Sequence, residues 1–137
     1  MPAFQPTADQ FRAFRDFGHD GPVAQVNLLK FRDKAIYQHD DPEYGDGSTG
    51  KDAYLRYAEA FERLAADSGG KCLFRGMAER FFIGTGDWDM VWINQFPDRH
   101  AFIAALNHKD YKDASRHRDA GLLYQDLVVT HPADTSE

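Results

Sequence analysis

The chain has 137 residues, 42% hydrophobic and 14% aromatic, which is enough for one domain with a sizeable core and too apolar for a disordered protein. Its 16 basic and 22 acidic residues leave a net charge of −6, which excludes the basic surface that nucleic acids and anionic membranes attract. A single cysteine excludes an internal disulfide and the start of the chain has no leader-like region, so we predict one cytoplasmic domain over residues 1–137, with no nucleic-acid or membrane partner.

The first half of the chain predicts a helix, a strand, a long loop and a second helix. Three phenylalanines recur near the helical period in residues 7–17, which predicts a short helix. Residues 23–31 are β-prone and bounded by turn residues, which predicts a strand. Residues 32–49 are rich in Asp, Gly and Pro and predict a long acidic surface loop, and the apolar stripe of residues 50–68 predicts the strongest helix.

The second half predicts three strands and a broken helix. Residues 71–77 and 89–96 are short β-prone runs. Between them, residues 78–88 hold a Phe-Phe-Ile segment that is either an extension of the preceding strand or an irregular connection. A proline and an aspartate then start a helical region, residues 98–120, which is interrupted near residue 107. The last strand is predicted over residues 124–130.

After the leading helix, the order β, α, β, β, α, β predicts an α+β, ferredoxin-like fold with a four-stranded antiparallel sheet and both crossover helices on one face. The strands do not alternate cleanly between apolar and polar residues, so both faces of the sheet are at least half apolar. Leaving the second face in water would cost roughly 10 kcal/mol. The simplest cover is the same face of a second copy, which predicts a homodimer.

Two loop motifs resemble ligand sites but do not fit. GDGSTGK resembles a phosphate-binding loop, yet Asp52 stands where a Mg²⁺-binding Ser or Thr should be, and Thr49 with Asp52 fits a helix capping box instead. The acidic residues of the same loop lack the spacing of a calcium loop. None of the six histidines is paired at i, i+3 or i, i+4. We therefore predict no metal and no cofactor.

Several polar residues stand on predicted strands among apolar neighbours. A buried amide or charge is costly unless it is paired, so these side chains either tie a dimer together or line a pocket. With aromatic side chains they would form the apolar cavity with a few polar groups that is typical of small-molecule sites. The predicted ligand-binding residues of this set are Asn27, Tyr54, Tyr57, Arg75, Trp88, Trp92 and Asn94.

His117 is the one histidine predicted near an apolar interior, on the segment that leads into the last strand. Its functional interpretation is a catalytic acid or base near neutral pH, and its structural interpretation is a core-edge histidine that bonds the backbone. Arg118 or Arg75 would anchor an anionic group, while Asn27 and Asn94 would orient the ligand.

Three stretches carry a family resemblance: AYLRYAEAF to GGKCLFRG, GDWDMVWINQFPDRHAFIAALNHKDY, and HRDAGLL. The features concerned are Gly69-Gly70 before a strand with Arg75-Gly76, Gly86-x-Trp88, and the strand end Phe96-Pro97. On these motifs the chain resembles the domain of unknown function 1330 family, a branch of the dimeric α/β barrel superfamily, over residues 50–132 and the first strand. The resemblance implies a ferredoxin-like protomer and a homodimer whose sheets face each other. It implies no activity, because the family is largely uncharacterised.

The sequence supports two interpretations of function and does not decide whether the protein is an enzyme. The first is a small cytoplasmic enzyme that acts on a hydrophobic or carbonyl-bearing metabolite in a cavity between sheet and helices. In that case replacing His117 with alanine should abolish turnover while the dimer persists. The second is a non-catalytic homodimeric module, small-molecule-binding or stress-related, in which the polar residues are structural.

Overall fold

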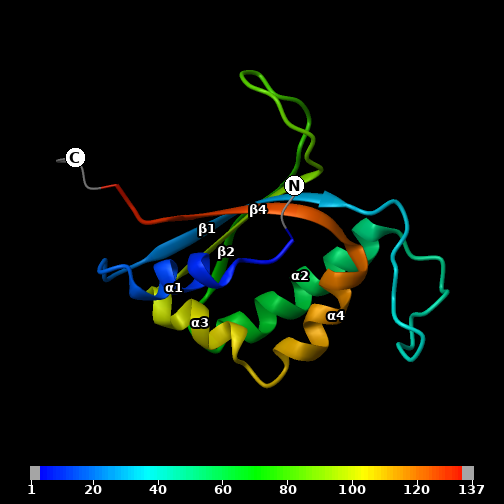
Figure 1. Ribbon diagram of the computed structural model, residues 1–137, viewed down its shortest axis with the longest axis horizontal. Helices are drawn as coiled ribbons and strands as arrows, with labels where there is room; N and C mark the ends of the chain where they lie inside the picture. The colour runs from blue at the N-terminus through cyan, green and yellow to red at the C-terminus, as the bar shows by residue number, and fades with distance from the viewer. Residues whose placement is uncertain (1–3, 134–137) are drawn as a thin grey trace.

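The computed structural model describes residues 4–133, and its elements follow the predicted order (Figure 1). The helices are α1 (Ala8–Asp16), α2 (Gly50–Ala66), α3 (Arg99–Leu106) and α4 (Tyr111–Gly121). The strands are β1 (Val23–Phe31), β2 (Lys71–Met77), β3 (Met90–Phe96) and β4 (Leu122–Thr130). The last strand begins two residues before the predicted start, directly where α4 ends.

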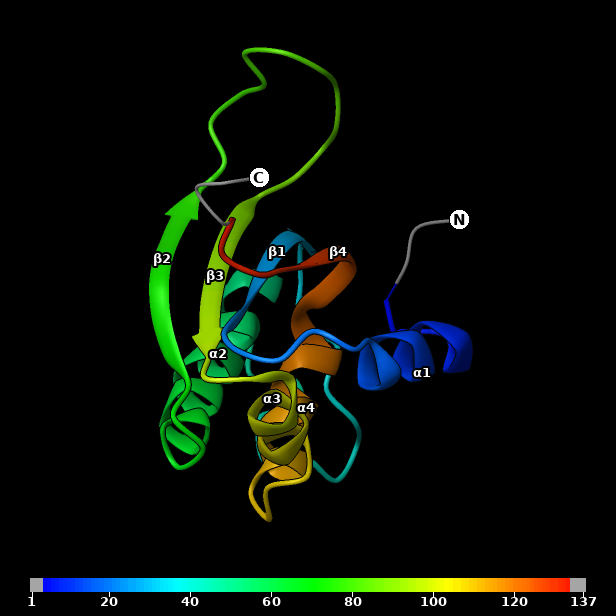
Figure 2. The same cartoon turned by 90° about the vertical axis from the view of Figure 1, so that its left-hand side faces the viewer.

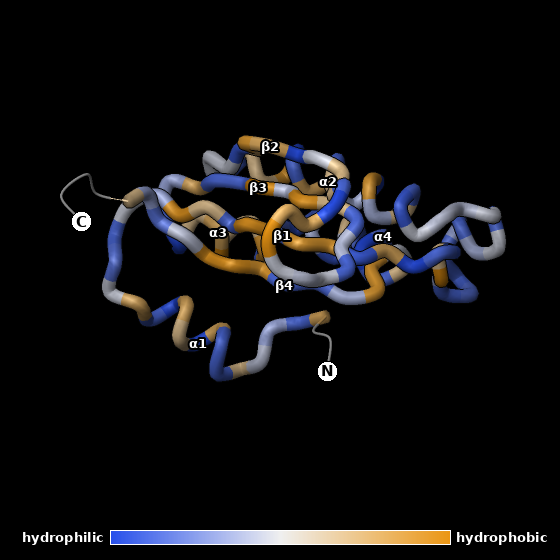
Figure 3. The backbone as a smooth tube through the Cα atoms, turned by 90° about the horizontal axis from the view of Figure 1, so that it is seen from above, coloured by the Kyte–Doolittle hydropathy of each residue, from blue (hydrophilic) through white to orange (hydrophobic). Residues whose placement is uncertain are grey.

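The four strands form one antiparallel sheet in the order β2-β3-β1-β4. Helices α2, α3 and α4 lie together on one face of this sheet, and the opposite face carries no helix (Figures 1 and 2). The predicted ferredoxin-like βαββαβ fold with an extra N-terminal helix is therefore confirmed. The extra helix, α1, lies beside the β4 edge of the sheet (Figure 3).

Local signals at both ends of α2 explain why the helix forms where it does. The Thr49 hydroxyl accepts from the Asp52 backbone N–H at 3.0 Å, and the Asp52 carboxylate accepts from the Thr49 N–H at 3.0 Å. This is the predicted capping box. At the other end Gly69 adopts a φ of 82°, and the Gly70 N–H donates to the Ala65 carbonyl at 2.9 Å. These contacts satisfy backbone groups that a helix end otherwise leaves unpaired.

We expect Thr49→Ala to lower the free energy of unfolding by about 1 kcal/mol, the usual effect of losing an N-cap. Thr7→Ala is the matched control, because Thr7 and Gln10 form the same box on α1. No residue of α1 itself is buried, so this helix can fray without global unfolding. Urea denaturation of both variants measures the difference, and equal losses would contradict the expectation.

The face of the sheet that the helices cover carries both the core and a band of polar side chains. Strands β1 and β3 alternate between buried and partly buried residues along their whole length. Across the strands, Asn94 lies opposite Gln25, and Trp92 lies opposite Asn27. These amides share the covered face with large apolar residues, namely Val23, Leu29, Phe31, Met90 and Phe96.

The opposite face of the sheet is apolar at its centre. One row of side chains crosses all four strands on this face, from Phe74 through Ile93 and Val26 to Val128. Phe74 and Val128, at the two ends of the row, are 56% and 53% exposed. Figure 3 looks onto this face and shows hydrophobic stretches of the neighbouring strands side by side. No element of residues 4–133 covers the row.

The connection over residues 32–49, for which we predicted a long acidic surface loop, packs against α2 and α4. Tyr37 is buried beside Ala53 and Ala120. Arg116 of α4 forms ion pairs with Glu43 at 2.8 Å and with Asp41 at 3.3 Å. Some acidic side chains of the connection, Asp41 and Glu43, therefore form ion pairs with α4 and do not only face solvent.

Candidate functional site

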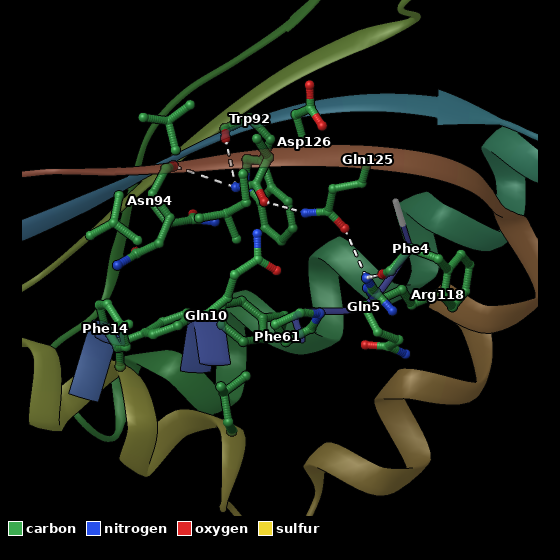
Figure 4. A pocket seen from close by; sticks show the side chains of 18 of the residues that line it. Phe4, Gln5, Gln10, Phe14, Phe61, Trp92, Asn94, Arg118, Gln125 and Asp126 are labelled. Carbon is green, nitrogen blue, oxygen red and sulfur yellow. Dashed lines mark hydrogen bonds between the residues drawn. The ribbon is translucent and has the colours of Figure 1, made fainter. Parts of the chain in front are cut away.

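A cavity of about 560 Å³ lies between the covered face of the sheet and the helices (Figure 4). Its sheet side consists of residues from β1, β3 and β4, and its other walls come from α2, α3, α4 and the segment that includes α1. Most of the lining is apolar or aromatic. The aromatic side chains are Phe4, Phe11, Phe14, Tyr54, Tyr57, Phe61, Trp92, Phe102 and Tyr111.

The amide of Gln25 is the unusual group in this cavity. Its side chain is 1% exposed, and neither its nitrogen nor its oxygen has a hydrogen-bond partner among residues 4–133. Burying a polar group without a partner typically costs 1–3 kcal/mol. Asn94, its neighbour on β3, is also buried at the cavity. The sheet side of the cavity therefore holds a buried donor and a buried acceptor that have no partner among residues 4–133.

A chain of hydrogen bonds, which starts at Arg118 of α4, links further polar side chains at the cavity. Arg118 donates from Nη2 to the Gln125 oxygen at 2.9 Å, and the Gln125 amide donates to the Asn27 oxygen at 2.7 Å. The Asn27 nitrogen donates to the Trp92 carbonyl at 2.9 Å (Figure 4). The chain holds the Arg118 guanidinium and two amides in fixed orientations.

The charge of Arg118 is poorly compensated for a buried group. The residue is 8% exposed, and its two short hydrogen-bond partners, Gln125 and the Phe4 carbonyl, are neutral. Its one ion pair among the described residues is with Asp119 at 3.8 Å, and the Asp119 side chain is 58% exposed. The guanidinium also lies over the Phe4 ring, 4.8 Å from its centre. A buried cation with such partners favours an anionic ligand group.

Tyr54 and Tyr57 bring two phenol rings from α2 to the cavity. Each ring meets Trp92 edge-on at a centroid distance of 6.0 Å. Burial raises the pKa of both hydroxyls well above the ordinary value of 10. Both phenols are therefore neutral at physiological pH, and they act as walls and hydrogen-bonding groups rather than as bases.

The wall of the cavity at the β4 edge of the sheet comes from α1, and a second buried arginine holds it. Arg99 donates to the carbonyls of Phe14 at 2.7 Å and His19 at 3.2 Å, and its guanidinium lies over the rings of Phe14 and Phe17. Arg118 holds the other end of this segment through the Phe4 carbonyl. The two arginines thus fix a wall whose helix buries no residue of its own.

The family called "domain of unknown function (DUF1330)" matches residues 47–131. This chain belongs to the DUF1330 family. No curated protein matches it. Methylated RPA0582 is similar, with 29% identity, a TM-score of 0.85 and 100% coverage of both chains. RPA0582 of Rhodopseudomonas palustris, a protein of unknown function, gives 29% identity, a TM-score of 0.84 and coverage of 98% of this chain and 99% of the other.

A more distant likeness is a dimeric protein of unknown function and ferredoxin-like fold from Bacteroides fragilis, with 15% identity and a TM-score of 0.50. The match covers 81% of this chain and 96% of that one. At this identity it shows the fold alone. The RPA0582 match extends over the whole length, so the likeness includes α1 and residues 32–46, which lie outside the segment that the DUF1330 family matches.

In this DUF1330 protein, most of the predicted ligand-binding residues meet at the cavity. The residues that line it are Asn27, Tyr54, Tyr57, Trp92, Asn94 and Arg118. Two others lie elsewhere. Arg75 donates to the Glu62 carboxylate at 2.6 Å and lies over the Trp92 ring from outside the cavity. Trp88 packs edge-on against Tyr124, near the uncovered face of the sheet.

His117 also lies outside the cavity, under the 32–49 connection. Its Nδ1 is 2.7 Å from the Tyr37 hydroxyl, which accepts a hydrogen bond from Arg56 at 3.0 Å. The Tyr37 hydroxyl can therefore donate its own proton to a neutral His117. The side chains of His117 and Arg118 point in different directions, because successive residues of a helix are rotated by about 100° around its axis. Arg118 reaches the cavity, whereas His117 reaches the connection.

We expect the 32–49 connection to make stability depend on pH through His117. Burial, followed by the charges of Arg116 and Arg56, lowers the pKa of its imidazole below the ordinary 6.5. As pH falls through 6.5, the unfolded chain therefore takes up a proton that the folded protein does not, and stability decreases. Urea denaturation between pH 8 and pH 5 should show a steeper loss for the wild type than for His117→Gln. Parallel curves would contradict this expectation.

Several lining residues were not predicted as ligand-binding. The sequence could have indicated Gln25 as a lining residue, because it stands two positions from Asn27 on the same strand and therefore points to the same side of the sheet. Gln125 is a polar residue beside Asp126 in the first half of its strand, a pattern that does not single it out. The contribution of α1 had no such signal, because a short amphipathic helix does not indicate which wall it completes.

Within residues 4–133, no helix is long and apolar enough to cross a membrane. No group of three or more His, Cys, Asp or Glu side chains in the same residues could hold a metal ion. The single cysteine, Cys72, lies on β2 and is exposed.

Proposed function

We propose that this DUF1330 protein binds a small molecule that combines an aromatic or otherwise apolar body with a carbonyl or carboxylate group. The observation that carries the proposal is the unpartnered, buried amide of Gln25 at a cavity. A ligand oxygen would accept from its nitrogen, and a ligand N–H or O–H would donate to its oxygen. Binding would then recover the free energy that the empty site leaves unsatisfied.

The size and the walls of the cavity support the same ligand class. Its volume of about 560 Å³ falls within the range of roughly 300–1,000 Å³ that small-molecule sites occupy. The aromatic rings around Trp92 suit a flat apolar body. Arg118 supplies a cation for an anionic group of the ligand. These features favour an aromatic acid or its amide over an aliphatic or cationic molecule.

Of the two interpretations of function, the binding module has the stronger support. Among the described residues that line the cavity, none is a histidine or a cysteine, and burial raises the pKa of Tyr54 and Tyr57. We assign His117 no role as an acid or base toward this ligand, because its imidazole is hydrogen-bonded to Tyr37 outside the cavity.

We further propose that the protein is a homodimer whose two sheets pack face to face. The support is the apolar row that crosses the uncovered face at Phe74, Ile93, Val26 and Val128. A related fold, that of the Bacteroides fragilis protein, is described as dimeric. Packing this face against a second copy would remove the row from water without any further element.

The ligand proposal can be tested with benzoate and benzamide, which have the same shape and differ in charge. Isothermal titration calorimetry of the purified protein should detect binding of both compounds, and native mass spectrometry should detect a small molecule that remains bound after purification. A protein that binds neither compound and carries no co-purified molecule would contradict the proposal.

We expect Gln25→Leu to weaken binding of both compounds by about 3- to 10-fold, the loss of one or two neutral hydrogen bonds. The same substitution should raise the free energy of unfolding of the unliganded protein by about 1–3 kcal/mol, because it removes a buried amide that has no partner. Gln38→Leu, at an exposed position of the 32–49 connection, is the matched control. If Gln25→Leu lowered stability and left binding unchanged, the amide would be structural.

A further inference from the structure

An apolar arm extends from the sheet between β2 and β3. We use "the arm" for residues 78–89. It leaves the sheet on the side opposite the helices and reaches well beyond the rest of the molecule (Figures 1 and 2). Phe82 and Ile83 stand near the middle of this segment and are 95% and 85% exposed, and we call these two residues the tip of the arm. The connection is irregular rather than an extension of β2. Two large apolar side chains at such a tip indicate a binding surface.

The base of the arm is fixed to the sheet. The Asp89 carboxylate accepts from the Phe31 N–H at 2.9 Å, and the Asp87 carboxylate accepts from Lys30 at 2.9 Å. The Tyr124 hydroxyl donates to the Asp87 carbonyl at 2.9 Å. These bonds join the arm to β1 and β4. The direction in which the arm points is therefore set by the sheet.

The arm is also packed against itself. A Cβ atom at Gly86 would lie 2.7 Å from the Phe81 ring and 2.7 Å from Trp88 Nε1, so the two aromatic side chains close over this glycine. Gly84, with a φ of 94°, forms the turn beyond the tip. Phe81 and Trp88 thus stiffen the arm, while Phe82 and Ile83 stay outside this packing.

We propose that the arm clasps a second copy of the chain, with Phe82 and Ile83 buried against the partner. This inference rests on the proposed homodimer. Packed sheets lie about 10 Å apart, and the arm rises from the same side of the sheet as the apolar row of Ile93 and Val26. A second sheet on that row would therefore lie alongside the arm. By two-fold symmetry the dimer holds two arms, so each substitution at the tip acts twice.

The charges near the tip favour a protein surface over a membrane. Glu79 and Arg80 precede the apolar tip and have opposite signs. Segments that insert into anionic membranes carry an excess of basic residues, which neither the arm nor the chain, with its net charge of −6, has. A second copy supplies the continuous apolar surface that starts at the foot of the arm.

The test is the dimer dissociation constant of the double variant Phe82→Ser/Ile83→Ser, measured by fluorescence-detected sedimentation. We expect an increase of at least about 100-fold, since four large apolar side chains per dimer return to water. Ile36→Ser is the control, because Ile36 is 64% exposed on the 32–49 connection and belongs to neither surface. An unchanged dissociation constant for the double variant, beside a dimeric wild type, would overturn the clasp and leave the sheet-to-sheet dimer standing.

A second measurement does not depend on weakening the dimer. A photoreactive benzoylphenylalanine at position 82 should give covalent dimers on irradiation, whereas the same group at position 36 should not. Mass spectrometry of the product should place the attachment on the other copy. Absence of covalent dimers from position 82 in a protein that sediments as a dimer would overturn the clasp. A monomeric wild type would overturn the homodimer and the clasp together.

Discussion

Ile93→Glu is expected to raise the dimer dissociation constant at least about 1,000-fold, so that the protein sediments as a monomer at micromolar concentration. Ile93 lies at the centre of the apolar row, between Val26 on β1 and Phe74 on β2. In the proposed dimer the substitution buries two carboxylates without partners, and removing a charge from water costs several kcal/mol. A 1,000-fold change corresponds to about 4 kcal/mol.

Ile36→Glu makes the same chemical change at a position that is exposed on the 32–49 connection. It should leave the dissociation constant within about twofold of the wild type. Circular dichroism should show that both variants keep their helices and strands. A folded Ile93→Glu protein that stays dimeric would show that the row is not the interface.

Arg118→Met is expected to weaken benzoate binding about 100-fold and benzamide binding by no more than about threefold. Methionine keeps the apolar stem of the side chain but loses the charge that the cavity presents. A charge-assisted hydrogen bond to a carboxylate contributes about 1.5–3 kcal/mol, and the isosteric amide has no charge to lose. Calorimetry with both compounds separates the two effects.

Arg116→Met is the matched control for the charge of α4. Arg116 stands two residues earlier and pairs with Glu43 and Asp41 outside the cavity. This variant should bind benzoate as the wild type does. Equal losses of benzoate and benzamide in Arg118→Met would mean that Arg118 acts only by holding Phe4 and Gln125 in place. Arg118→Lys, which keeps the charge, should recover part of the benzoate affinity.

Much of the fold could be predicted because its signals are local. The capping box predicted at Thr49 involves residues three positions apart, and it is present in the structure. The lack of clean apolar and polar alternation along β1 and β3 indicated that both faces of the sheet are at least half apolar, and the structure covers one of them with helices. The Phe-Phe-Ile segment was ambiguous because a short apolar run suits a strand and a loop equally well.

The candidate site could be predicted only in part, and the reason differs between residues. Asn27, Trp92 and Asn94 lie on the covered face of two neighbouring strands, so strand parity was sufficient to group them. His117 could not be placed, because one step along a helix decides whether a side chain meets the sheet or the connection. Arg75 of β2 pairs with Glu62 of α2, and this contact between a strand and a helix could not be predicted from the pattern of neighbouring residues.

The sequence by itself determined the order of the elements, the start of the helices and the two-sided apolar character of the sheet. Each depends on residues a few positions apart, whose spacing is set by helical or strand periodicity. Only the tertiary structure decided where the cavity lies. Gln125 meets Asn27 across 98 positions, and Arg118 meets Phe4 across 114. Such contacts follow from how the helices and the N-terminal segment pack on the sheet, and packing brings together residues that carry no common signal along the chain.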